Sequence, residues 1–178
     1  NSAFVAQLKD DGFVIAEQSH SNYAKTILSI PSTLNMDYVD TFAPGLDDSK
    51  FWWLMEPFID HSEVRTLLKS QGYQTVSFST NWSLTDMNSA DIHLAAFPVE
   101  LTDFEQYLLQ TTPLRLSQPF LQDSASVFTS ETQRRTILHT LGALDDFVSD
   151  PDPVFVFAHI LLPHPPFVLD AEGKPVQS

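Results

Sequence analysis

The run PVFVFAHILL, residues 153–162, is the most strand-like stretch of the chain and restricts the possible folds most. It follows a segment, residues 130–148, whose apolar residues recur at helical spacing. These residues are Ile137, Leu138, Leu141, Leu144 and Phe147. A helix that leads directly into a buried strand is typical of α/β proteins.

The same alternation of helix and strand runs along the rest of the chain. Further strands are predicted at GFVIAE (12–17, buried), YQTVSFST (73–80) and DIHLAAF (91–97). Helices are predicted at residues 3–9, 49–70 and 100–110, the second capped by Asp47, Asp48 or Ser49 and ending near Gly72. Strands that alternate with helices imply right-handed crossovers. We therefore expect an α/β fold with a mainly parallel sheet and helices on both faces.

Composition and charge exclude several classes of protein. With 178 residues, 43% of them hydrophobic, the chain can bury one sizeable core. No apolar run reaches 18 residues, and the start NSAFVAQLKDDGF lacks the pattern of a signal peptide. The net charge of −14 disfavours nucleic acid as a partner. The absence of cysteine excludes disulfides, thiolate zinc sites and cysteine nucleophiles in this chain.

Two polar stretches stand beside predicted strands. SNYAKTILSIPSTLN, residues 21–35, is rich in serine and threonine at the predicted start of a helix, and HILLPHPPF, residues 159–167, ends the last strand. A threonine at such a junction caps the helix, fills a loop or, less often, acts as a nucleophile. Ligand sites of open α/β sheets lie beyond the carboxyl ends of the strands. We therefore expect the two stretches to meet in space.

The two stretches together resemble the alkaline phosphatase and sulfatase superfamily, and more closely its branch of phosphoethanolamine transferases and lipoteichoic acid synthases. Thr26, Ser29 and Pro31 fit a Thr-x-x-Ser-x-Pro segment of that branch. The spacing of its late histidine motif is reproduced by His159, His164, Pro166 and Phe167. The wider run of residues 10–40 is similar to bacterial membrane-anchored sulfatase-like hydrolases.

The resemblance implies a metal-dependent hydrolase or transferase of phosphate or sulfate esters, small or lipid-linked. Thr26 would be the nucleophile and would bind a divalent metal such as Zn, Mn, Mg or Ca. The second histidine of the motif, His164, would donate a hydrogen bond or a proton. His159 is either a substrate ligand or a satisfied strand histidine. Lys25 and Ser29 either contact the substrate or serve as a solvated lysine and a helix-start hydroxyl.

The chain also departs from the family pattern. Members bind metal through acidic residues on an earlier strand and through a later Asp-His pair, and neither block is present in residues 1–178. We therefore expect residues 1–178 to form one partial domain, an alkaline phosphatase-like three-layer sandwich incomplete at both ends. By itself this domain should bind little or no metal and turn over little substrate.

The resemblance also implies that the parent protein is anchored in a membrane by segments outside this chain, with the present domain outside the cytoplasm.

Two other hypotheses remain open. The chain could instead be a non-catalytic α/β binding or assembly module of the same fold. A generic α/β domain with a chance motif match requires Thr26 and His164 to lie far apart.

Overall fold

The centre of the molecule is an open sheet of three parallel strands. The structure is a computed structural model that describes residues 2–16, 18–46, 52–80, 82–121, 123–126, 129–147, 152–165 and 167–176. The strands are β1 (Gln74–Phe78), β2 (Ile92–Leu94) and β3 (Val154–Phe157), in the order β2-β1-β3. Ser77 of β1 lies opposite His93 on one side and Phe157 on the other. The three strands therefore end at the same edge of the sheet.

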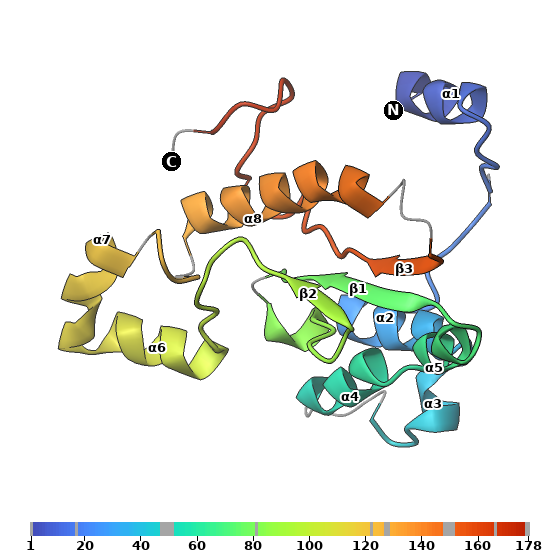
Figure 1. The fold of residues 1–178 in the computed structure, drawn as a ribbon, viewed down its shortest axis with the longest axis horizontal. Coiled ribbons are helices and arrows are strands. Elements are labelled where there is room, and N and C mark those ends of the chain that lie inside the picture. The colour runs from blue at the N-terminus through green and yellow to red at the C-terminus, as the bar shows by residue number, and fades with distance from the viewer. Residues whose placement is uncertain are drawn as a thin grey trace.

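Helices lie on both faces of this sheet (Figure 1). One face carries α2 (Thr26–Leu34), α4 (Glu56–Asp60) and α5 (Glu63–Ser70), and the other carries α8 (Ser130–Ala143) with the 3-10 helix η4 (Leu144–Phe147). On the first face, Leu34, Ile59 and Met87 form a buried cluster with Phe155 and Phe157. The ring of Phe78 meets His139 and Phe147 edge-on, at centroid distances of 6.4 and 6.2 Å. The observed fold is thus α/β with an all-parallel sheet.

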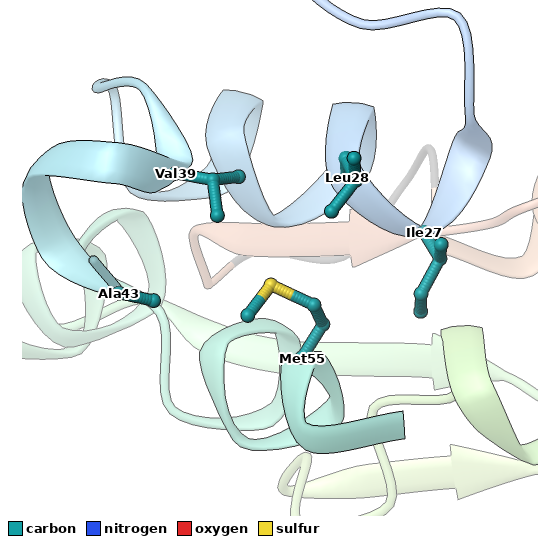
Figure 2. Packing of buried hydrophobic residues seen from close by; sticks show 5 residues of the cluster. All are labelled: Ile27, Leu28, Val39, Ala43 and Met55. Atoms are coloured by element: carbon teal, nitrogen blue, oxygen red, sulfur yellow. The ribbon is translucent and has the colours of Figure 1, made fainter. Parts of the chain in front are cut away.

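A second cluster holds the start of α2 in place (Figure 2). Ile27 and Leu28 of its first turn pack with Met55, which is fully buried at the end of the 3-10 helix η1 (Trp52–Met55). Val39 and Ala43, at the two ends of α3 (Val39–Phe42), complete the cluster. Figure 2 shows Ile27 at the end of the sheet toward which the strand arrows point. Helix α2 therefore begins at the carboxyl edge.

Five short helices complete the described part of the chain. They are α1 (Ser2–Asp10), η2 (Ser83–Thr85), α6 (Asp103–Thr111), η3 (Pro113–Ser117) and α7 (Gln118–Leu121). One of them, η2, packs against α2 and α4. Thr102 caps α6 in a reciprocal capping box with Glu105. None of the helices in the described ranges combines the length and the apolarity needed to cross a bilayer.

The strand predicted at GFVIAE is wrong for the residues that the structure describes. Residues 12–16 lie in an extended connection between α1 and α2, away from the sheet (Figure 1). The side chains of Phe13 and Val14 are 61% and 98% exposed. A strand exists only where another strand completes its hydrogen bonds, and an apolar pattern does not supply that partner.

The helix predicted over residues 49–70 is interrupted. It is replaced by η1, α4 and α5, and the proposed caps Asp47, Asp48 and Ser49 lie outside the described residues. Ser62 starts a new helix, because its hydroxyl accepts the Arg65 amide at 3.4 Å. Gly72, with φ of 85°, follows the end of α5 as predicted.

Helix α8 buries only part of the predicted apolar stripe: Ile137 is buried, but two of its leucines are not. Leu138 and Leu141 are 43% and 47% exposed. Its buried residues are Thr132, Gln133, Thr136, Ile137 and Thr140. The predicted strand at 73–80 is confirmed as β1, whereas β2 and β3 are shorter than predicted. Because β3 ends at Phe157, both His159 and His164 follow the strand.

Candidate functional site

The two residues singled out by the sequence motifs line one cavity. Its volume is about 230 Å³. Thr26 lines the cavity from the start of α2, and His164 lines it from the segment after β3. The rest of the described lining consists of Thr80, Trp82, Thr132, Gln133, Leu161 and Pro165. The cavity therefore lies where an α/β sheet usually binds its ligand, beyond the carboxyl ends of its strands.

Thr26 is the first residue of α2, not its cap. The N-cap position belongs to Lys25, whose side chain makes no capping hydrogen bond. The carbonyl oxygen of Lys25 accepts the amides of Leu28 and Ser29, at 3.0 and 2.9 Å. The Thr26 side chain is exposed. Its hydroxyl is thus free of the ordinary capping role that a threonine at a helix start usually serves.

The other hydroxyls of this stretch hold the preceding loop against α2. Asn22 Nδ2 donates to Ser32 Oγ at 2.7 Å, and Ser29 Oγ donates to Asn22 Oδ1 at 2.6 Å. Tyr23 OH accepts the amide of Val39 at 2.9 Å. Among the described residues, Ser29 and Lys25 are not part of the cavity lining. The serine-rich turn therefore fixes the position of Thr26 within the fold.

One hydrogen bond determines the form of the His164 ring. His164 Nδ1 lies 2.6 Å from the carbonyl oxygen of Pro165. A carbonyl oxygen only accepts, so Nδ1 carries the proton and donates it. In the neutral ring, Nε2 is then the nitrogen with the lone pair. The exposed His164 side chain can accordingly take up a proton at Nε2.

His159 faces a second, smaller cavity. Its Nδ1 lies 3.0 Å from Thr85 Oγ1, and burial lowers the pKa of the ring. The smaller cavity has a volume of about 10 Å³. It shares Thr80, Gln133 and Leu161 with the larger one. His159 therefore stands behind the wall of the main cavity, as a neutral ring at pH 7.

A buried carboxyl group orients Thr80 on the cavity wall. Asp86 Oδ1 accepts the Thr80 amide at 2.9 Å and the Thr80 hydroxyl at 2.7 Å. Asp86 is 7% exposed, and burial raises its pKa to about 6. The Thr80 hydroxyl itself accepts the Trp82 amide at 3.1 Å. Asp86 thus holds Thr80 directly, and it holds the backbone of Trp82 through the Thr80 hydroxyl.

His93 is held in a separate polar network. The fully buried Ser77 hydroxyl donates to the carbonyl oxygen of Met87 at 2.7 Å, so it accepts from His93 Nδ1, also at 2.7 Å. His93 Nε2 lies 3.0 Å from Glu100 Oε2, and this hydrogen bond raises the pKa of His93. The ring is therefore an imidazolium. A buried serine that already donates to a carbonyl is not a nucleophile.

The described residues do not fit a divalent metal at Thr26. Across the described ranges, no three His, Asp or Glu side chains are grouped so that they could hold an ion. Asp86 is bound to Thr80, Asp91 to Lys69 and Thr75, and His93 to Glu100. In the described lining of the cavity, His164 is the one side chain of these three types. A metal site needs more donors than this.

Half of the cavity was not predicted from the sequence. Thr80 and Trp82 follow β1, and single residues in a connection have no spacing to mark them. The wall contributed by α8 does carry a signal. Uncharged polar residues recur at helical spacing at positions 132, 133, 136 and 140, and the structure shows that this polar face is buried.

Comparison of the chain with family models, with curated proteins and with solved structures gave no match. Function is therefore argued from the cavity and the residues around it.

Proposed function

We propose that this cavity binds a phosphate or sulfate ester and that the Thr26 hydroxyl attacks it. One observation carries the proposal: Thr26 and His164, distant in sequence, line the same cavity beyond the carboxyl edge of a parallel sheet. A weak hydroxyl nucleophile needs a group that takes its proton. His164 Nε2 is the acceptor that the described lining offers.

The reaction follows from these two groups. The Thr26 oxygen forms a bond to the phosphorus or sulfur atom, and its proton passes to His164 Nε2. The bond to the ester oxygen breaks, and the departing alcohol takes the proton from His164. Water or an acceptor alcohol then resolves the ester on Thr26. The dipole of the nine-residue α2, which has no side-chain cap, favours the anionic group at this end.

Several finer points belong to the proposal. An unmodified threonine favours phosphate over sulfate esters. The resemblance implies an alkaline phosphatase-like sandwich, a domain outside the cytoplasm of a membrane-anchored protein, and a divalent metal. Because the described residues offer no ligand set for a metal, no step above is assigned to one. Small and lipid-linked esters share the phosphoryl group that the site would recognise.

A second candidate is a non-catalytic binding module. The small number of titratable groups favours it, because His164 is the one carboxylate or imidazole in the described lining. Such a module would bind the same anion but would form no covalent bond to it. The two functions therefore differ in a single observable, the ester on Thr26.

Trapping that ester is the decisive experiment. The chain is incubated with 4-nitrophenyl phosphate, and the reaction is quenched in acid. The protein is then digested, and the masses of its peptides are measured by mass spectrometry. We expect one phosphoryl group on the peptide that contains Thr26, even where turnover is slow. Thr26→Ala should abolish it, and Thr26→Ser should retain it. Thr33→Ala is the matched control, because Thr33 is an exposed threonine of the same helix outside the described lining of the cavity.

Two results would contradict the proposal. A phosphoryl group that persists in Thr26→Ala would place the nucleophile elsewhere. Binding of the ester, detected by NMR titration, without any covalent product would leave the non-catalytic module as the function.

A further inference from the structure

Trp82 is the largest side chain in the described lining of the main cavity, where it stands with the apolar Leu161 and Pro165. Trp82 is half-buried. Its backbone is held at both polar atoms: the amide donates to Thr80 Oγ1 at 3.1 Å, and the carbonyl oxygen accepts the Thr85 amide at 3.0 Å. Because these atoms are already paired, Trp82 offers the cavity the apolar surface of its indole.

The cavity is larger than the group that Thr26 would attack. A phosphoryl group with its three oxygens needs about the space of three or four water molecules, at about 30 Å³ each. The cavity has a volume of about 230 Å³. About half of it is therefore left for the alcohol part of the ester. This remainder is close to the roughly 150 Å³ in which a protein cavity holds one benzene molecule.

The charges around the cavity limit the alcohol further. The described lining contains no carboxylate. Asp86 does not supply one, because it is buried and bonded to the Thr80 amide and hydroxyl. The ammonium group of an amino alcohol would thus lie in the cavity without a counterion. An uncharged alcohol fits this wall better.

The supply of protons favours an acidic alcohol. In the proposed reaction the departing oxygen takes its proton from His164, the one titratable side chain in the described lining. A phenol leaves as a weak base, because its pKa is about 10, as for the tyrosine side chain. An alkanol is closer to water, whose pKa is about 16, and depends far more on that proton.

We infer that Trp82 makes the site selective for phosphate esters of uncharged, single-ring aromatic alcohols. This inference rests on the proposed function: Thr26 and His164 act on the phosphoryl group, and the ring of the alcohol packs against the indole. Two aromatic rings attract each other in offset or edge-on arrangements beyond the gain from buried area alone. A wall whose backbone is already fixed loses little freedom when the ligand binds.

The test compares esters that separate size, aromaticity and charge. Dissociation constants are measured by NMR titration for methyl, cyclohexyl, phenyl and 2-aminoethyl phosphate. We expect phenyl phosphate to bind about tenfold tighter than methyl phosphate, because its ring is buried. It should bind about threefold tighter than cyclohexyl phosphate, which is similar in size but not aromatic. The 2-aminoethyl ester should bind no tighter than the methyl ester.

Variants assign the preference to Trp82. Trp82→Leu keeps an apolar side chain and removes the ring, so it should bind phenyl and cyclohexyl phosphate equally. Its affinity for methyl phosphate should stay within about twofold of the wild type, which also reports that the variant is folded. Trp82→Phe keeps a ring and should retain the preference. Trp53→Leu, at a 50% exposed position outside the described lining, is the matched control and should retain it too.

Each outcome has a distinct meaning. If methyl phosphate binds and phenyl phosphate gains nothing, Trp82 does not select the alcohol and the proposed function stands. If Trp82→Leu still prefers the phenyl to the cyclohexyl ester, the ring of the ligand packs elsewhere and the role of Trp82 is refuted. Tightest binding of the 2-aminoethyl ester would overturn the uncharged alcohol. If none of the esters binds, the proposed function fails and this inference fails with it.

Discussion

The three histidines around the sheet edge differ in their hydrogen-bond partners and in their burial. His164 donates from Nδ1 to a carbonyl oxygen, which leaves Nε2 to accept a proton. His93 lies between a serine oxygen and the Glu100 carboxylate and is charged. Burial keeps His159 neutral. Only His164 combines a position in the main cavity with a ring nitrogen that can accept a proton.

Asp86 should weaken the fold as the pH rises. Its pKa is about 6 in the folded chain against an ordinary value of 3.8, so the folded state holds the proton more tightly. Stability from this group is present at pH 4 and is lost as the pH rises through about 6. Asp86→Asn keeps an oxygen for Thr80 and removes the charge. In urea titrations, the free energy of unfolding of this variant should exceed that of the wild type by about 2–3 kcal/mol at pH 7. At pH 4 the two proteins should be equally stable.

Asp91→Asn is the control of opposite sign. A hydrogen bond from Lys69, supported by Thr75, holds the pKa of Asp91 well below its usual range. This variant should be less stable than the wild type at pH 7, and the difference should shrink as the pH falls below about 4. Equal pH profiles for the two variants would show that burial does not govern Asp86.

At the level of elements, the sequence predicted those parts whose cause is local. The start of α2 and the strand β1 follow from nearby residues. The position of Thr26 and His164 around one cavity follows instead from the rule that parallel strands end at one edge. The strand predicted at residues 12–17 needed a neighbouring strand, which an apolar pattern does not specify, and residues 12–16 form no strand. Gln133 was not predicted because a polar residue of a helix usually faces solvent, whereas here it is buried.

The break between α4 and α5 provides a test at this scale. Ser62 is fully buried and accepts the Arg65 amide, so it satisfies one of the free donors at the start of α5. Ser62→Ala should lower the free energy of unfolding by about 1 kcal/mol in urea titrations. Ser70→Ala, an exposed serine in the last turn, should change it by less than about 0.5 kcal/mol. Increased stability in Ser62→Ala would mean that residues 56–70 prefer one continuous helix.

At the scale of the whole molecule, the cavity gathers segments from most of the chain. Helix α2 supplies Thr26, the connection after β1 supplies Thr80 and Trp82, α8 supplies Gln133, and the segment after β3 supplies His164. The sheet has only three strands, so the position of this cavity depends on the clusters that fix α2 and α8 to its two faces. Stability and the geometry of the site are therefore linked.

The chain carries a net charge of −14, and added salt should change its stability by screening that charge. With 23 acidic and 9 basic residues, the folded state is opposed by repulsion among its own carboxylates. The ion pairs Lys69–Asp91, Arg134–Glu131 and Arg135–Asp123 act in the other direction, but partly exposed pairs contribute little. At 0.1 M salt the screening length is about 10 Å, which weakens long-range repulsion more than short contacts.

We therefore expect NaCl to raise the free energy of unfolding at pH 7 as the concentration increases from about 0.02 to 0.2 M. The rise should be equal in Thr26→Ala, because screening does not depend on the cavity. At pH 4, where many carboxylates are protonated, it should be much smaller. A fall in stability with NaCl at pH 7 would mean that the few ion pairs outweigh the excess of negative charge. The fold would then depend on specific pairs such as Lys69–Asp91 more than their partial exposure suggests.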